Sequence, residues 1–376
     1  MRVLLFDPSG TTNYCNGLAD GLNEHRDVEL DVVVRDNYSA LIDESYSIYK
    51  YFLLSDKYAK NKIRKATNYL KGYYKTILQI RKKRYDIFHV QWFLNYTVDI
   101  FFLKIIRKYV KHIVYTAHNI KPHVEGDKQI NHLKKIYSLV DKIVVHGEAS
   151  KEELLSNFDI EPDKIVIQAH GLNNRICPKY SCDKVSECFK EKISKCQGKI
   201  YLYLGVIFEN KGVDRLFNYW AKNTEKNVDD LLIVAGMISE ETENYKKSVK
   251  EIKEIRNILY KPGRVSVEDH HYLYEHASVV VLPYRHASMS GVVFDAATFS
   301  TPILTTDVGC ISEYLENSKD SFVVKNTDND FNEMMDKIHC MDSKVLIEMG
   351  KQLNINISVK CNWSTIATKL IKDAYE

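Results

Sequence analysis

Residues 278–313 read SVVVLPYRHASMSGVVFDAATFSTPILTTDVGCISE, a succession of strand, polar loop, helix and second strand. The uninterrupted apolar run at 278–283 is typical of a strand that is buried on both faces. A second short apolar run lies at 302–305, beyond a helical stretch. Two buried strands joined by a helix predict an α/β domain with a parallel sheet.

The polar loop between these two strands has the features of an anion site. It covers residues 284–290, and Ser290 stands where the N-cap of a helix over 291–299 is expected. A strand, a loop and a helix N-terminus in this order present free backbone N–H groups to a diphosphate. Asp295 lies one turn into the helix, within reach of a pair of ribose hydroxyl groups.

This segment resembles the donor-binding motif of GT-B glycosyltransferases, particularly the retaining family 4. That motif has two acids separated by seven residues, the second of which opens a helix, and then a conserved pattern of Pro, Thr or Ser, and Gly. The residues that fit it are Asp295, Pro302, Thr305 and Gly309. The first acid falls at Ala287 and is missing. A Ser-Gly-Val variant also occurs in such enzymes, and it is matched by Ser290, Gly291 and Val292, whose N–H groups the resemblance assigns to the donor.

A second strand–loop–helix pattern lies upstream, at residues 201–220 (YLYLGVIFENKGVDRLFNYW). A Lys beside free N–H groups at a helix start forms an anion site on physical grounds. By resemblance, Gly205 and Lys211 belong to the donor site and Lys211 binds the donor phosphates, although an Arg usual in the family before this Lys is absent. Arg264 lies in the loop where family members hold the nucleotide base. A surface Lys in a plain βα turn is the alternative for Lys211.

The first strand, RVLLFD at 2–7, leads into the loop PSGTTNY, which contains a single glycine. One glycine is far short of the pattern of a dinucleotide-binding turn. The resemblance places Gly10 and Thr11 under the donor diphosphate. A tight βα turn that binds no ligand is the alternative.

His118 ends the strand pattern at 112–118 (HIVYTAH). Ligands of open α/β sheets bind at the carboxyl ends of the strands, so this side chain is expected in a binding cleft. By resemblance, a His at this place contacts the transferred sugar. The alternative is a histidine whose hydrogen bonds are satisfied within the structure.

The domain organisation follows from a linker. Residues 169–173 (AHGLN) resemble the interdomain linker of the family. We therefore expect a Rossmann-like acceptor domain at 1–172, a Rossmann-like nucleotide-sugar-binding domain at 173–360, and a helix at 361–376 that crosses back to the first domain. The resemblance implies an α/β fold of the GT-B class, and we expect the two domains to face each other across a cleft.

A basic stretch at residues 56–85 contains eleven Lys and Arg against one Asp. Apolar and aromatic residues recur in it every three or four positions: Tyr58, Ile63, Tyr69, Leu70, Tyr73, Ile77 and Ile80. Such a basic amphipathic helix suits an anionic membrane surface, which residues 57–84 are expected to contact. A solvated helix face and a nucleic-acid site are the alternatives, and no nucleic-acid-binding module accompanies the stretch.

Composition fits an ordinary globular protein of 376 residues, 45% apolar and 27% charged. The net charge of +3 is uneven: +5 over residues 1–172 and −2 over the rest. The eight cysteines show no zinc-site spacing and suggest reduced thiols. No signal peptide or spanning helix is evident. A cytoplasmic protein attached to the inner face of the membrane is expected.

The predicted function is transfer of a sugar from a UDP- or GDP-sugar to a glycan or lipid-linked acceptor, with Lys211 and His118 in catalytic roles. The resemblance implies retention of configuration. No Asp-x-Asp metal motif occurs, so neither a metal nor a cofactor is expected. The alternatives are a nucleotide-sugar epimerase, with Glu125 and Asp127 as bases, and an inactive glycosyltransferase-like partner subunit, to which the missing acid at Ala287 points.

Overall fold

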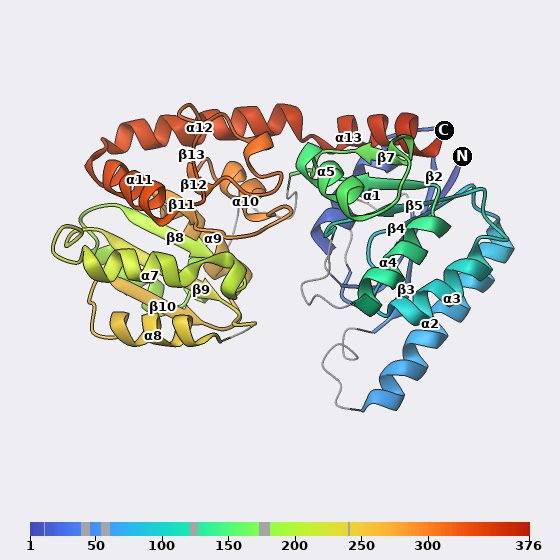
Figure 1. Cartoon of the computed structure of the whole chain (residues 1–376), viewed down its shortest axis with the longest axis horizontal. Coiled ribbons are helices and arrows are strands. Elements are labelled where there is room, and N and C mark those ends of the chain that lie inside the picture. Colours follow the sequence, from blue (N-terminus) through green and yellow to red (C-terminus); the bar gives the residue numbers. More distant parts are fainter. Residues whose placement is uncertain (11, 39–45, 54–60, 121–126, 173–180, 240) are drawn as a thin grey trace. The chain divides into compact units, whose positions relative to one another are not determined.

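The computed structural model describes the whole chain except residues 11, 39–45, 54–60, 121–126, 173–180 and 240. The chain divides into two compact units (Figure 1). Unit 1 contains Met1–Arg175 together with Cys361–Glu376, and unit 2 contains Ile176–Lys360. Thr11, Glu125 and the first part of the basic stretch, at 57–60, lie outside the described residues.

Unit 1 is built on a seven-stranded parallel sheet in the order β3-β2-β1-β4-β5-β6-β7. Its strands are β1 Arg2–Asp7, β2 Glu29–Arg35, β3 Ser47–Phe52, β4 Ile87–Val90, β5 His112–Thr116, β6 Lys142–Val145 and β7 Ile165–Ile167. Its helices are α1 Thr12–Asn23, α2 Lys62–Lys83, α3 Tyr96–Ile106, α4 Asp127–Leu139, α5 Glu148–Asn157 and α13 Trp363–Leu370, followed by a π-helical turn, η6 Ile371–Tyr375.

Successive side chains of β1 point to opposite faces of the sheet, and the core of unit 1 has one cluster on each face. Leu4 and Phe6 pack in one cluster with side chains of α2, α3 and α4. Val3 and Leu5 pack in the other cluster with α1 and α13. Burial of the strands on both faces explains their continuous apolar runs.

The last helix, α13, is part of this second cluster. The indole Nε1 of Trp363 donates a hydrogen bond to the carbonyl of Leu172 (2.6 Å). The indole ring lies so close to α1 that a Cβ on Gly17 would stand 2.1 Å from its Cε2 atom. Glycine is therefore needed at position 17 to let α13 dock on unit 1.

Unit 2 has a six-stranded parallel sheet in the order β10-β9-β8-β11-β12-β13. Its strands are β8 Ile200–Leu204, β9 Leu231–Gly236, β10 Ile258–Pro262, β11 Val279–Leu282, β12 Ile303–Thr306 and β13 Ser321–Val324. Its helices are α6 Glu187–Lys195, α7 Val213–Lys222, α8 Glu243–Ile252, α9 Val267–His276, α10 Val292–Thr298, α11 Asp328–Cys340 and α12 Ser343–Lys360. The strand order reverses between β8 and β11, and between β1 and β4 in unit 1, so ligand sites are expected at these switch points.

Candidate functional site

The loops that follow β8 and β11 are joined at the switch point of unit 2. The backbone N–H groups of Arg285 and His286 both donate to the carbonyl of Asn210 (2.8 and 3.2 Å). The Arg285 guanidinium donates two hydrogen bonds to the Asp214 carboxylate (2.7 and 2.8 Å). Gly212 has a φ of +63°, and a Cβ there would lie 1.9 Å from the carbonyl oxygen of Pro283. The two loops thus form one fixed surface at the carboxyl edge of the sheet.

Lys211 lies on this surface, at the end of the 3₁₀ turn Glu209–Lys211 and directly before α7. Its ammonium stands 3.7 Å from the centre of the Tyr284 ring and 5.9 Å from that of Phe208. Burial lowers the pKa of Lys211 to about 8. In the part of the chain that is described, no carboxylate lies within ion-pair distance of it. A desolvated cation that is held by an aromatic ring and has no counter-ion there is ready to receive an anion.

Ser290 does not cap the following helix as the sequence analysis expected. The helix α10 begins at Val292 and its N-cap is Gly291. The Ser290 hydroxyl instead meets the Tyr284 hydroxyl (3.1 Å), and burial raises the pKa of Tyr284 to about 12. Among the described residues, none accepts a hydrogen bond from the N–H groups of Ser290, Gly291 or Val292. Space is also open beside Gly291, where a Cβ would meet nothing within 4 Å.

The remaining predicted donor residues lie on neighbouring elements of unit 2. Gly205 follows β8, and its N–H donates to Ala235 (3.1 Å). The Asp295 carboxylate lies 3.3 Å from Nε2 of His270 on α9. Arg264 is exposed in the loop after β10. All of these residues share the carboxyl side of the sheet with Lys211.

The corresponding edge of unit 1 holds a cluster of four histidines, one from each of four neighbouring strands or the loops that follow them. They are His89, His118, His146 and His170. The ring of His118 stacks on Trp92 (4.7 Å, 13°) and meets Tyr14 edge to face (4.8 Å). Burial, together with the other three histidines, lowers the pKa of His118 well below its ordinary value.

The hydrogen bonds of the cluster define the tautomer of His118. Nδ1–H of His146 donates to the carbonyl of Gln168 (3.1 Å), so Nε2 of His146 is an acceptor. It accepts from Nδ1–H of His118 (3.1 Å), which leaves a lone pair on Nε2 of His118. The atom that lies 3.3 Å from this nitrogen is Oε1 of the Gln91 side-chain amide, which is itself an acceptor. Turning this amide by 180° gives the buried nitrogen of Gln91 the partner that it otherwise lacks among the described residues.

Gly10 occupies the first loop of unit 1 in a left-handed conformation, with a φ of +76°. Its carbonyl accepts a hydrogen bond from the Asn37 side chain (3.2 Å). A Cβ on Gly10 would approach Arg35 Cδ to 2.9 Å. The turn therefore requires glycine for its conformation, whether or not a ligand binds there.

Sequence reasoning missed four side chains that shape these two edges: Tyr284, Arg285, His146 and His170. Tyr284 and Arg285 are the second and third residues after the strand β11, and His146 directly follows β6. Polar residues within a few positions of the end of a buried strand are the signal that could have found them, as it indicated His118.

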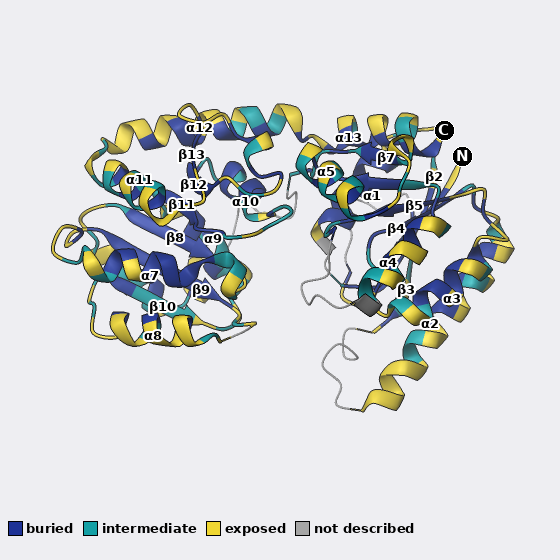
Figure 2. Ribbon diagram, in the orientation of Figure 1, coloured by how far each residue is buried: buried dark blue, intermediate teal, exposed yellow. Residues whose placement is uncertain are grey.

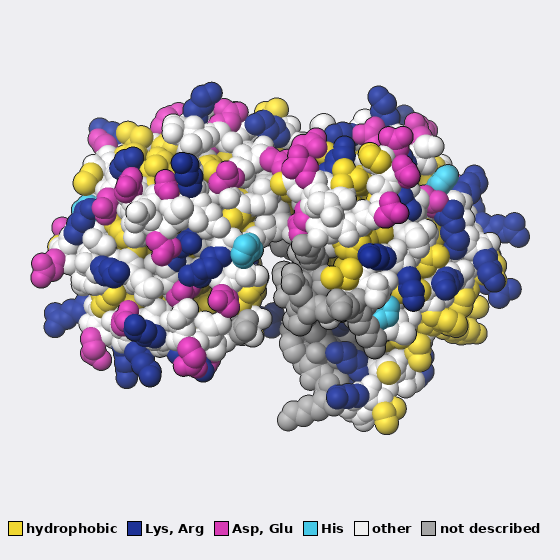
Figure 3. All heavy atoms as spheres, in the orientation of Figure 1, with side chains coloured by type: hydrophobic (Ala, Val, Ile, Leu, Met, Phe, Trp, Pro, Cys, Tyr) yellow, Lys and Arg dark blue, Asp and Glu magenta, His cyan; other side chains and the backbone are white. Residues whose placement is uncertain are grey.

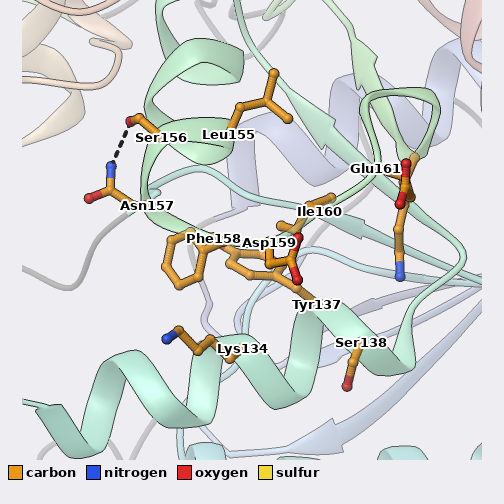
Figure 4. Close-up of a pocket in the computed structure, with 11 residues that line it drawn as sticks. Lys134, Tyr137, Ser138, Leu155, Ser156, Asn157, Phe158, Asp159, Ile160 and Glu161 are labelled. Carbon is orange, nitrogen blue, oxygen red and sulfur yellow. Dashed lines mark hydrogen bonds between the residues drawn. The ribbon is translucent and has the colours of Figure 1, made fainter.

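A hollow of about 950 Å³ lies elsewhere in unit 1, between α4, α5 and the chain that enters β7 (Figure 4). The rings of Tyr137 and Phe158 meet edge to face there at 4.9 Å. The hollow opens at the amino edge of the sheet, opposite the histidines, and contains none of the predicted site residues. Within the described ranges, no group of three or more His, Cys, Asp or Glu is arranged to hold a metal ion, and no helix is long and apolar enough to span a membrane.

Two doubly wound α/β units, each built on a parallel sheet, are the architecture of GT-B glycosyltransferases. Two family models match the chain: Glycosyltransferase Family 4 over residues 8–174 and Glycosyl transferases group 1 over residues 186–351. Together the two models account for most of the sequence. The chain belongs to this family of GT-B glycosyltransferases, as the resemblance in the sequence implied.

Curated relatives are matched over part of their length. An uncharacterized glycosyltransferase of Haemophilus influenzae is 26% identical over 62% of this chain and 60% of its own. The capsular polysaccharide biosynthesis glycosyltransferase CapM of Staphylococcus aureus is 25% identical over 52% of this chain and 50% of its own. The chain therefore spans about half to three fifths of the relatives it matches.

Solved structures share the fold at low identity. Sucrose-phosphate synthase of Thermosynechococcus elongatus has a TM-score of 0.72 at 15% identity, and covers 99% of this chain and 98% of its own. Anabaena HepE in complex with UDP and glucose has a TM-score of 0.70 at 13% identity, with the same coverage. WaaG, a glycosyltransferase involved in lipopolysaccharide biosynthesis, has a TM-score of 0.66 at 13% identity over the whole of both chains.

Proposed function

We propose that the protein transfers a sugar from a nucleotide-diphosphate sugar to a hydroxyl group of a glycan or lipid-linked acceptor, with retention, in the synthesis of a bacterial cell-surface polysaccharide. The donor is assigned to unit 2 and the acceptor to unit 1. Family membership supports the reaction class. The capsular role named for CapM and the UDP and glucose held by HepE support the kind of product and donor.

Lys211 carries this proposal. When the glycosidic bond breaks, its electron pair goes to the diphosphate oxygen, and negative charge grows on the leaving group. The ammonium held over Tyr284 and the N–H groups of residues 290–292 stabilise that charge electrostatically. Because these groups supply the positive charge, the reaction is expected to need no metal. The acceptor oxygen forms the new bond to the anomeric carbon, and its proton passes to the departing phosphate.

The other groups of unit 2 bind the nucleoside of the donor. Asp295 accepts hydrogen bonds from the ribose hydroxyls, and Arg264 lies beside the base. In unit 1, His118 remains neutral, so it accepts a hydrogen bond from a hydroxyl of the acceptor through Nε2, replacing the long contact with Gln91. Ala287 occupies the place of the family's first acid, so no covalent sugar–enzyme intermediate is proposed at that position.

Calorimetric titration with UDP, GDP and their sugars tests the donor assignment. Micromolar binding of one nucleotide, lost in Asp295→Ala and unaffected by a metal chelator, is the expected result. Glu313→Ala, in the loop after β12, is the control. If none of these nucleotides binds to the folded protein, an inactive partner subunit becomes the better interpretation.

We also propose that α2 attaches the protein to an anionic membrane surface. The helix exposes an apolar stripe at Ile63, Leu70, Tyr74 and Leu78, which are 80%, 46%, 62% and 45% exposed. Basic side chains border the stripe at Arg64, Lys71, Lys75 and Lys82. Other apolar residues of the predicted pattern, Tyr69, Tyr73, Ile77 and Ile80, pack against or within the core instead. Figure 3 shows hydrophobic and basic side chains side by side over the region of α2 and α3.

Vesicle sedimentation tests this attachment. Each basic residue near an anionic surface contributes about 1 kcal/mol, so replacing the four bordering residues by Gln should release the protein from vesicles rich in phosphatidylserine. The matched control replaces Lys192, Lys195, Lys247 and Lys250 of unit 2. Equal vesicle binding by all three proteins would show that α2 is only a solvated face.

A further inference from the structure

A pocket of about 280 Å³ lies at the carboxyl edge of the unit 1 sheet, separate from the histidine cluster. It is formed at the ends of β2 and β3, by the first turns of α2 and by the loop after β4. Three apolar side chains form part of its wall, those of Phe52, Leu53 and Leu94. Because this is the edge at which sheets of this type bind ligands, the pocket is placed for a substrate.

The charged groups in the pocket wall are all positive. Among the described residues that line it, the ionisable cations are Arg35, Lys62 and Lys65, and there is no carboxylate. Arg35 is only 6% exposed, and its guanidinium is fixed by hydrogen bonds to the carbonyls of Pro8 and Leu53. The two lysines are exposed and form no ion pair within the described part of the chain. A site with this charge selects an anion.

The wall beneath these cations is rigid. Tyr69 lines the pocket, and its hydroxyl donates to the buried Asp99 carboxylate (2.6 Å). The same carboxylate accepts from the Tyr73 hydroxyl (2.8 Å) and from the N–H of Asn95 (2.8 Å). Asn95 in turn caps α3 through Val98 (3.2 Å). The pocket is therefore held open by a network that does not depend on a ligand.

One loop connects this pocket with His118. Gln91 and Trp92 contact the His118 ring, and Leu94 and Asn95, two and three residues after Trp92, line the pocket. Three residues of extended chain span at most about 10 Å. A molecule with a hydroxyl at His118 can therefore extend along this loop toward the pocket.

We propose that this pocket binds the phosphate or diphosphate of a prenyl-phosphate-linked acceptor, with the start of the prenyl chain on its apolar wall. The inference rests on the proposed function in assigning the acceptor to unit 1. Charge complementarity selects the phosphate, whereas Phe52, Leu53 and Leu94 favour an attached apolar chain over a free phosphate. The exposed stripe lies on the same helix, α2, that contributes the two lysines, so a lipid-borne acceptor is compatible with the proposed membrane face.

Binding of farnesyl diphosphate, measured by calorimetry on the full chain in detergent below its micellar concentration, tests the proposal. We expect saturable binding that saturating UDP and GDP leave unchanged. Lys62→Gln with Lys65→Gln should weaken it roughly tenfold or more, since two charge-assisted contacts are lost. Lys247→Gln with Lys250→Gln removes the same charge from the exposed side of α8 in unit 2 and should have no effect.

Two further ligands identify what is recognised. Inorganic diphosphate and farnesol should each bind at least tenfold more weakly than farnesyl diphosphate, and Leu94→Ser should reduce the preference over inorganic diphosphate. Equal affinity for inorganic diphosphate would overturn the prenyl assignment. Competition by UDP, or unchanged affinity in the Lys62/Lys65 variant, would overturn the site. If the wild-type protein binds farnesyl diphosphate but neither UDP nor GDP, the donor proposal is refuted and the proposal of a prenyl-phosphate pocket stands.

Discussion

The two sheets present chemically opposite groups at corresponding edges. In unit 2 the edge carries a cation whose pKa lies near physiological pH, backbone N–H groups and open space beside Gly291. In unit 1 it carries four histidines, of which His118, His146 and His89 have pKa values lowered chiefly by burial. The first arrangement suits a developing negative charge, and the second suits a neutral hydroxyl group. Similar topology thus supports different chemistry because the residues after the strands differ.

Removal of the cation should have the largest effect. Lys211→Ala is expected to lower kcat about 10²- to 10³-fold, the usual loss for one charge-stabilising donor in a reaction centre. The fold should remain, since the ammonium makes no ion pair among the described residues. Steady-state kinetics and the thermal unfolding midpoint check both points, with the exposed Lys222→Ala as control. Near-normal turnover of Lys211→Ala would refute its role.

Removal of the neutral imidazole of His118, a hydrogen-bond acceptor in unit 1, should lower kcat less than removal of the Lys211 ammonium. His118→Ala is expected to lower kcat about 10- to 100-fold, because a hydrogen bond between neutral groups contributes less than one to a charge. The ratio of variant to wild-type rates should be constant between pH 6 and 8, since His118 stays neutral throughout this range. A ratio that changes across that range would show that His118 titrates, and the contrast between the edges would fail.

The pH profile distinguishes the edges directly. With a pKa of about 8, Lys211 loses its proton in the free enzyme above that pH. Donor binding needs the protonated form, so kcat/KM should fall about tenfold for each pH unit above 8. Lys211→Arg keeps its charge at these pH values and should lose this decline even if its activity is lower. A decline that persists in Lys211→Arg would assign the titration to another group.

Substitution of Tyr284 should have the smallest effect on catalysis. Tyr284→Leu removes the ring that holds the ammonium and should lower kcat/KM about 3- to 10-fold, in line with a partly desolvated cation–π contact. Tyr284→Phe keeps the ring and loses only the hydrogen bond to Ser290, so it should stay close to wild type. Equal effects of the two substitutions would instead assign the role to the hydroxyl.

Sequence patterns predicted the fold well where strands are buried on both faces. Continuous apolar runs predicted β8, β9 and β11, and the loops after them predicted the position of Lys211. The edge strand β3 was missed, because its sequence SIYKYF contains the exposed Lys50 and two tyrosines, Tyr49 and Tyr51, that are only partly buried against the core. An edge strand lacks the uniform apolar run of a central strand.

The candidate site was less predictable because its partners are distant in sequence. The contact between His118 and His146, and that between Lys211 and Tyr284, join residues that no local spacing relates. The basic stretch illustrates a second limit. Its spacing predicted one apolar face, but α2 has two: Tyr73 and Ile80 are buried, whereas Ile63 and Tyr74 are exposed. Figure 2 shows that the first half of α2 is exposed nearly all round, which local periodicity cannot reveal.

The docking of Trp363 on Gly17 has a consequence for biosynthesis. The core of unit 1 contains residues from both the beginning and the end of the sequence, and all of unit 2 lies between them. During translation, unit 2 can complete its own core first, while unit 1 waits on the order of ten seconds or more at typical elongation rates for α13. In that interval the face of α1 around Gly17 and Leu18 is uncovered, and the nascent chain is a substrate for chaperones that bind apolar surfaces. Substitutions at Trp363 should therefore reduce the yield of soluble protein more than they reduce the specific activity of the molecules that fold.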